Sequence, residues 1–222
     1  SAPANILTLA GTTPTITVNA LGDTKTATIS AVVAGSSGLT KTGPGTLILT
    51  GANTYGGTTA ITSGTLQIGN GGTSGTLGSG PVTIASGATL AIHRSDDYSP
   101  AQGISGPGAL IKAGGGTLTL SGNITHSGGT TINGGILKAG VNQAFGGSGA
   151  TVTLNGGSMD LNGYPQTLAA LNGNAAGGVQ GGTGLTSVLT LGSGNASSTF
   201  GGALSGNLAL VKIGGGTLAL TG

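Results

Sequence analysis

The chain has 222 residues, of which 50 are glycine and only 5% are charged, and it lacks cysteine and tryptophan. Its net charge of +2 comes from scattered basic residues, whereas nucleic-acid-binding surfaces cluster many Lys and Arg side chains, so we expect no nucleic-acid partner. The missing cysteine excludes disulfides and thiolate metal sites. So few charges and aromatic rings argue against a compact α/β enzyme, and the low net charge with frequent apolar runs argues against disorder.

Short apolar runs alternate with polar residues along the whole chain. They lie at residues 46–49, 65–68, 82–84, 89–92, 117–120 and 151–154. A period of two is typical of half-buried strands, and Gly, Asn, Ser and Pro separate the runs. No helical pattern persists for three turns, and no run reaches the ~18 apolar residues of a membrane helix. The sequence therefore predicts an all-β fold.

One sequence pattern occurs three times. Residues 33–51 read VAGSSGLTKTGPGTLILTG, residues 104–122 read ISGPGALIKAGGGTLTLSG, and residues 204–222 read LSGNLALVKIGGGTLALTG. Self-similarity of this kind predicts a repeat architecture. Near the end of each copy two leucines flank a variable residue, as Leu118 and Leu120 flank Thr119. Because successive strand residues point to opposite faces, we expect the leucines to line a core and the middle residue to face water.

The spacing of the apolar runs predicts a β-solenoid. Leu47 and Leu66 are 19 residues apart, as are Leu118 and Leu137, and units about 19–28 residues apart fit one coil each. Aromatic residues are too few for an ordinary sandwich, and the copies are too unequally spaced for a propeller. We predict one continuous solenoid over residues 1–222 with roughly 9–11 coils. An insertion or extra coil is expected within about 162–203, where the copy spacing lengthens.

The similarity between the copies extends beyond this pattern. The first copy continues as ANTYGGTT at 52–59 and SGTLQIG at 63–69, and the second continues with Asn123, residues 128–132 and residues 135–137. The whole resembles the autotransporter-associated β-strand repeat, also called the passenger-associated transport repeat. The resemblance covers most of the chain and is weaker only at positions 1–30. It implies a right-handed parallel β-helix on, or released from, a Gram-negative cell surface, with the repeat assisting secretion and folding.

The one charge cluster is HRSDDY at residues 93–98. In a strand Asp96 and Asp97 would point to opposite faces, which does not suit a glycosidase pair, and a calcium site needs about six to eight oxygens. We interpret the cluster as a solvated loop with a local salt bridge between Arg94 and a neighbouring Asp. His93 and His126 are far apart in the sequence, each without a second ligand nearby, so we expect no metal site.

A lysine recurs in each copy, at Lys41, Lys112 and Lys212. We expect these lysines to cap a strand end or to hydrogen-bond a carbonyl at a corner, with an anionic glycan site as the alternative. The glycine runs 114–116 and 214–216 lack the ending of a phosphate loop and are interpreted as corners. Irregular Thr-x-Thr pairs leave ice binding as a remote alternative. The sequence therefore predicts no catalytic residue, cofactor or metal.

The expected function is structural and non-enzymatic: a surface-exposed or secreted passenger segment that serves as a stalk or as a self-associating or adhesive module. The abrupt end at Gly222 favours part of a longer helix or head-to-tail filaments, and the outer membrane would be reached only through a barrel outside this sequence. One alternative is a polysaccharide-active enzyme, which requires Asp23, Asp96, Asp97 and Asp160 to converge. Another is an adhesin that binds a surface glycan through residues 162–203.

Overall fold

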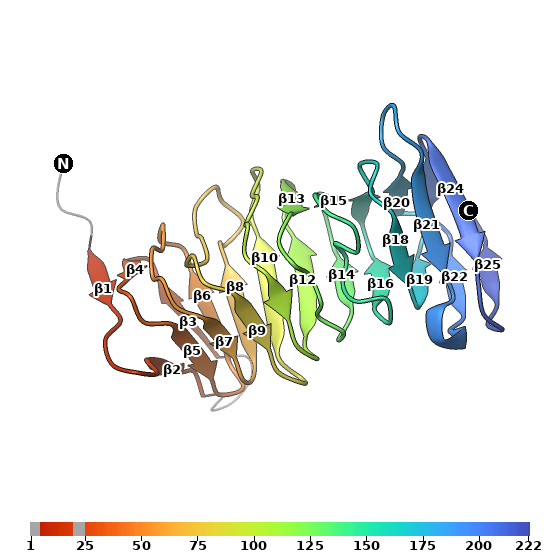
Figure 1. The fold of residues 1–222 in the computed structure, drawn as a ribbon. Coiled ribbons are helices and arrows are strands. Elements are labelled where there is room, and N and C mark those ends of the chain that lie inside the picture. Colours follow the sequence, from red (N-terminus) through yellow and green to blue (C-terminus); the bar gives the residue numbers. More distant parts are fainter. Residues whose placement is uncertain (1–4, 20–24) are drawn as a thin grey trace.

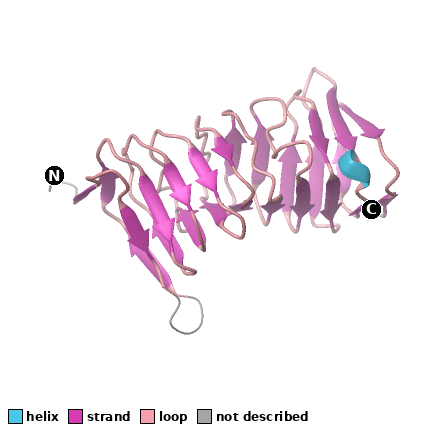
Figure 2. Cartoon of the chain, turned by 60° about the horizontal axis from the view of Figure 1, so that its bottom comes forward, coloured by secondary structure: helices cyan, strands magenta, loops and turns pink. Residues whose placement is uncertain are grey.

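A computed structural model describes residues 5–19 and 25–222. Parallel strands stack side by side into an elongated solenoid, with the N-terminus at one end and the C-terminus at the other (Figure 1). The described residues contain strands and one short 3₁₀ turn, η1 (Ser193–Asn195), and no α-helix (Figure 2). None of their helical segments is long and apolar enough to cross a membrane. The predicted all-β solenoid is confirmed.

One sheet, which we call the first face, runs through the whole solenoid with one strand from each coil. Its ten strands set the number of coils at ten, within the predicted range. In spatial order they are β3 (Thr26–Ile29), β6 (Thr46–Leu49), β8 (Thr65–Ile68), β10 (Thr89–His93), β12 (Ala109–Ala113), β14 (Thr130–Ile132), β16 (Thr151–Leu154), β19 (Ala170–Gly173), β22 (Ser198–Phe200) and β25 (Leu218–Leu220).

Four shorter sheets form the other two sides of the coil. The second face holds β1 (Ile6–Thr8) and β4 (Val32–Ala34), and further along the axis β13 (Thr117–Leu120), β15 (Ile136–Ala139), β17 (Gly157–Asp160), β20 (Gly177–Gln180) and β23 (Ala203–Ser205). The third face holds β2 (Thr15–Thr17), β5 (Leu39–Thr42), β7 (Thr59–Ile61), β9 (Val82–Ile84) and β11 (Ile104–Ser105), then β18 (Gln166–Leu168), β21 (Ser187–Leu191) and β24 (Leu208–Lys212). The chain visits the faces in a fixed cyclic order, as in β16, β17, β18, β19.

The strand register confirms the coil length that the sequence spacing predicts. Leu47 is the direct ladder partner of Leu66, and Leu118 is the partner of Leu137. The step between first-face partners is as short as that from Thr46 to Thr65 and as long as that from Gly173 to Phe200. The longest step lies inside residues 162–203 and contains η1. The wider spacing of the third copy reflects additional coils, because the path from Lys112 in β12 to Lys212 in β24 is one coil and one side longer than the path from Lys41 in β5 to Lys112.

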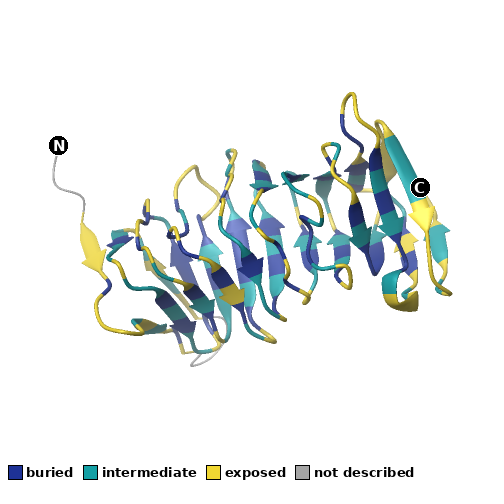
Figure 3. Ribbon diagram, viewed as in Figure 1, coloured by how far each residue is buried: buried dark blue, intermediate teal, exposed yellow. Residues whose placement is uncertain are grey.

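A column of mostly aliphatic side chains fills the interior along the axis, and Figure 3 shows buried segments in strands along the length of the solenoid. On the first face Leu47, Leu66, Leu90 and Leu110 are successive ladder partners, and all are fully buried. Each contributes roughly 1.5–3 kcal/mol by leaving water. Inward side chains of one coil stack directly on those of the next, and Tyr55, Phe145 and Phe200 are aromatic members of the same core.

The predicted facing of the repeated leucines is largely confirmed. Leu118 and Leu120 are buried while Thr119 between them is half-buried on the outer side. The prediction is wrong at Leu220 of the third copy, which is 49% exposed in the last strand of the structure, and at Ile48, the middle residue of the first copy, which is only 9% exposed. Ile48 lies between its ladder partners Thr28 and Gln67, one on each neighbouring strand, and these neighbours cover it.

The repeat is not tied to one face of the solenoid. In the first copy Lys41 lies in β5 on the third face and Leu47 in β6 on the first face. Their counterparts in the second copy, Lys112 and Leu118, lie in β12 on the first face and β13 on the second. The offset between these two copies therefore equals three coils and one further side. The third copy lies on the same faces as the first copy, with β24 on the third face and β25 on the first.

Candidate functional site

The lysine of each copy lies at a corner of the coil. Lys41 points inward in β5, between its ladder partners Ile16 and Ile61, and is 0% exposed. Its Nζ donates to the carbonyl oxygens of Thr42 at 2.9 Å, Gly43 at 2.8 Å and Ser63 at 3.1 Å. An ammonium has three donors, so all of them are used. Because Ser63 belongs to the next coil, the side chain ties two coils together.

The second copy repeats this arrangement closely. Lys112 is 2% exposed, and its Nζ donates to the carbonyls of Ala113 at 3.0 Å, Gly114 at 2.8 Å and Gly134 at 3.1 Å. Lys212, in the last coil of the structure, is exposed and donates to Ile213 and Gly214. Burial lowers the pKa of Lys41 and that of Lys112.

The corner itself requires glycine. Gly43 and Gly114 follow the lysines by two residues, and both have φ of +77°, in the left-handed region where glycine is favoured. A Cβ at Gly114 would lie 2.2 Å from the carbonyl oxygen of Arg94. The predicted carbonyl-bonding role of the lysines is confirmed. The alternative, an anionic glycan site, does not fit Lys41 and Lys112, since their ammonium groups are buried.

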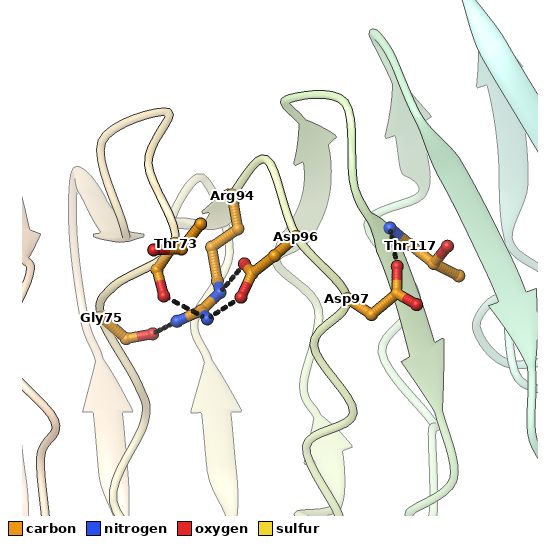
Figure 4. Close-up of polar contacts among 6 residues, drawn as sticks. All are labelled: Thr73, Gly75, Arg94, Asp96, Asp97 and Thr117. Carbon is orange, nitrogen blue, oxygen red and sulfur yellow. Dashed lines mark hydrogen bonds and ion pairs between the residues drawn. The ribbon is translucent and has the colours of Figure 1, made fainter.

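The charge cluster at residues 93–98 forms hydrogen bonds to neighbouring coils (Figure 4). The Nε and Nη2 atoms of Arg94 donate to the two carboxylate oxygens of Asp96 at 2.9 and 2.8 Å. The same guanidinium donates to the carbonyls of Thr73, at 2.7 Å, and of Gly75 in the preceding coil. The hydrogen bond from Arg94 lowers the pKa of Asp96. The predicted salt bridge is confirmed.

The interpretation of this cluster as a solvated loop is wrong for Arg94, which is 8% exposed. Its guanidinium packs against the loop of the preceding coil and lies 5.0 Å from the centre of the Tyr98 ring. Residues 94–97 form a bend rather than a strand. Asp97 points away from Asp96 and accepts a hydrogen bond from the backbone nitrogen of Thr117 at 3.1 Å. The cluster therefore contacts both the preceding and the following coil.

The carboxylates do not form a catalytic cluster among the described residues. Asp96 and Asp97 contact Arg94 and Thr117, and Asp160 lies 3.6 Å from Lys138. Asp23 lies outside the described residues. Across residues 5–19 and 25–222, no three His, Cys, Asp or Glu side chains come together as a metal site would require.

Sequence reasoning considered His126 only as a metal ligand and missed its structural setting. In the first copy the hydroxyl of Tyr55 is 2.8 Å from Oγ1 of Thr59, and both side chains are buried. At the corresponding positions of the second copy, Nε2 of His126 is 2.8 Å from Oγ1 of Thr130. His126 is fully buried, its Nδ1 has no hydrogen-bond partner, and burial lowers its pKa to about 4. The tyrosine that occupies this position in the first copy would have signalled this role.

A second buried difference lies two residues before Tyr55 and His126. Asn53 accepts a hydrogen bond from the Val33 nitrogen at 2.8 Å and donates to the Thr76 carbonyl at 2.7 Å, which links three coils. Its counterpart in the second copy is the apolar Ile124, which is also buried. Matching the second copy on Asn123, as the sequence pattern suggested, was therefore wrong by one residue.

A family model described as the passenger-associated-transport-repeat matches residues 39–68 and 110–139. Each match covers four strands that form two adjacent ladder pairs: β5 with β7 and β6 with β8, then β12 with β14 and β13 with β15. The chain therefore contains two copies of the passenger-associated transport repeat. Each matched block therefore spans parts of two adjacent coils and contains one lysine corner.

A relative of much greater length also matches. This chain is 35% identical over 192 residues to a protein named "Adhesin BmaC autotransporter" from Brucella suis biovar 1 (strain 1330). The match covers 85% of this chain and 5% of that protein. The chain therefore spans a small fraction of the relative's length. No solved structure matches the chain.

Proposed function

We propose that this chain is a stalk segment of a surface-exposed or secreted autotransporter passenger and that its outer surface is adhesive. The observation that carries the proposal is the pair of transport repeats inside one continuous ten-coil solenoid. The similarity to an autotransporter adhesin supports the adhesive part.

The charged side chains support a structural, non-enzymatic role. Lys41, Lys112 and Arg94 bond backbone carbonyls of neighbouring coils, and Asp97 bonds a backbone nitrogen. A catalytic group has to reach a substrate instead. The bonds to neighbouring coils resist sliding and bending between coils, which suits a stiff stalk.

The adhesive part is tested with beads coated with the purified chain and added to cultured animal cells. Beads coated with albumin, and beads coated with the Leu118→Asp chain, are the controls. We expect the folded wild-type chain to hold more beads on the cells than either control. Binding equal to that of albumin would contradict adhesion.

Self-association along the axis is the second part of the proposal. Apolar side chains are exposed on strands at both ends of the described solenoid, including Ile6, Leu7 and Val211, and stacking of coils would cover them. Sedimentation velocity over a wide concentration range should show oligomers that grow with concentration. A single monomeric species at every concentration would contradict it.

A further inference from the structure

The third face lacks regular strands in two consecutive coils. Its first sheet ends at β11 and its second begins at β18, and residues 121–128 and 141–150 cross this face between them as loops. A single bridge from Ile104 to Ile124 is the remaining ladder contact. A groove of about 650 Å³ lies here, within the range of roughly 300–1,000 Å³ that is usual for small-molecule sites.

The groove has a neutral, hydrogen-bonding lining. None of its lining residues is ionisable, and six of them carry a hydroxyl or an amide whose side chain makes no hydrogen bond to the described protein: Ser121, Asn123, Thr125, Asn142, Ser148 and Thr167. Ile124, buried, and Val141, half-buried, supply an apolar part of the surface. The groove therefore offers free donors and acceptors beside an apolar patch.

One residue holds two walls of the groove together. Gln143 has φ of +57°, which is uncommon for a residue other than glycine. The side-chain Oε1 of Gln143 accepts a hydrogen bond from the backbone nitrogen of Thr167 at 3.0 Å, and the backbone nitrogen of Gln143 donates to the Pro165 carbonyl at 3.3 Å. The groove is thus fixed in shape before any ligand arrives, which reduces the entropy cost of binding.

The corresponding place in the first copy differs in chemistry. A groove of about 430 Å³ lies there, lined among others by Asn53, Thr76, Tyr98 and Gln102. Asn53 and Thr76 bond each other's backbone, Tyr98 accepts from the Leu77 nitrogen, and Gln102 donates to a carbonyl. Four polar side chains of this groove thus bond neighbouring coils, whereas Gln143 is the one polar side chain lining the groove of the second copy that makes a hydrogen bond to the described protein.

We propose that the groove of the second copy binds a neutral oligosaccharide. Sugar hydroxyls can bond the free hydroxyls and amides, and the C–H face of a sugar ring can pack on Ile124 and Val141. An anionic sugar would find no cation among the lining residues, and an apolar ligand would leave the polar groups unpaired at a cost. This inference rests on the proposed adhesive function and assigns its ligand class and site.

The test is an array of neutral oligosaccharides of galactose, glucose and N-acetylhexosamines, printed beside sialylated and sulfated ones. The test variant combines Asn123→Ala with Asn142→Ala. The matched control combines Asn19→Ala with Asn70→Ala, two exposed asparagines outside the groove that make no side-chain hydrogen bond to the described residues. We expect the wild type and the control to bind neutral oligosaccharides, and the test variant to bind about tenfold more weakly, as loss of two hydrogen bonds implies.

Equal melting temperatures of the three proteins show that the fold is unchanged. Three results overturn the inference: no binding to neutral oligosaccharides, binding confined to sialylated or sulfated ones, or equal binding by the test variant. The bead assay separates the two proposals. If beads with the test variant adhere as the wild type does, the groove inference fails and adhesion stands. If wild-type beads do not adhere although the array shows groove-dependent binding, adhesion fails and the groove stands.

Discussion

The two matched repeats, at residues 39–68 and 110–139, share their strands, leucines and lysine corner but differ at several buried positions, two of them on the side without regular strands. Tyr55 and Asn53 of the first repeat are replaced by His126 and Ile124 in the second. The shared features make backbone ladders, aliphatic contacts and corner bonds. These two replacements change side-chain bonds on the side without regular strands. The two repeats therefore keep the same corners and leucine column but stabilise this side with different side chains.

Substitutions in the leucine column are expected to cause the largest loss of stability, and to do so in both repeats. Leu47→Asp and Leu118→Asp each place a carboxylate at a fully buried position, so each should cost about 4 kcal/mol or more in free energy of unfolding. Thr119→Asp, on the outer side beside Lys138, should stay within about 0.5 kcal/mol of wild type. Denaturant unfolding measures all three. Equal midpoints for Leu118→Asp and Thr119→Asp would refute the facing of this strand.

The residue at the Asn53 position is expected to stabilise the first repeat but not the second. Asn53→Ile, which copies the second repeat into the first, removes two buried hydrogen bonds to neighbouring coils and should cost about 3 kcal/mol. Asn123→Ile is the control because Asn123 is exposed, and its cost should stay within about 0.5 kcal/mol. A similar loss of stability in both variants would show that Asn123, rather than Ile124, is the counterpart of Asn53.

The buried histidine should make the second repeat sensitive to acid. The pKa of His126 is about 4 in the folded chain, against an ordinary value of about 6.5. The unfolded state therefore binds more protons between these values. The stability from neutral burial is complete above pH ~6.5 and falls as the pH drops toward 4, by at most about 3 kcal/mol.

His126→Tyr restores the residue of the first repeat and should remove this part of the pH dependence. Urea unfolding of wild type and variant from pH 4 to 8 measures the difference, and His93 is common to both proteins. Parallel stability curves for the two proteins would mean that His126 is not buried as described.

The smallest of these effects is expected at the lysine corners, and it should be equal in both repeats. Lys41→Met and Lys112→Met keep the aliphatic stem but remove three hydrogen bonds to corner carbonyls, which water replaces in part. Each should cost about 2 kcal/mol. Lys212→Met, with two carbonyl bonds on an exposed side chain, should cost less. An equal cost for Lys212→Met would show that the tie between coils contributes nothing.

Much of the fold could be predicted from sequence because period-two alternation and a regular coil spacing are local signals. Leu47 and Leu66 became ladder partners as their spacing implied. The lysine corners were also foreseen as carbonyl-bonding groups, since a charged residue recurring beside glycines has few other structural roles. The pattern does not show how deeply a side chain is buried. Arg94 was expected in solvent and is buried, because the loop that covers it comes from the preceding coil.

The groove and the buried histidine depend on which residues of distant coils meet. Ile124 and Asn123 are neighbours in sequence, and only the constant offset between the two copies distinguishes the buried counterpart of Asn53 from the exposed residue beside it. The groove was also not located by sequence, which pointed to residues 162–203. It lies mainly at 121–148, where the repeat leaves the third face without regular strands.

The central claim is that buried lysines tie consecutive coils in each transport repeat. Nuclear magnetic resonance of ¹⁵N-labelled lysine ammonium groups tests it most directly, with Lys41→Arg and Lys112→Arg used for assignment. The account predicts slow hydrogen exchange with water for the Nζ groups of Lys41 and Lys112, and fast exchange for Lys138, whose side chain is at the surface. Exchange at Lys41 and Lys112 as fast as at Lys138 would contradict it.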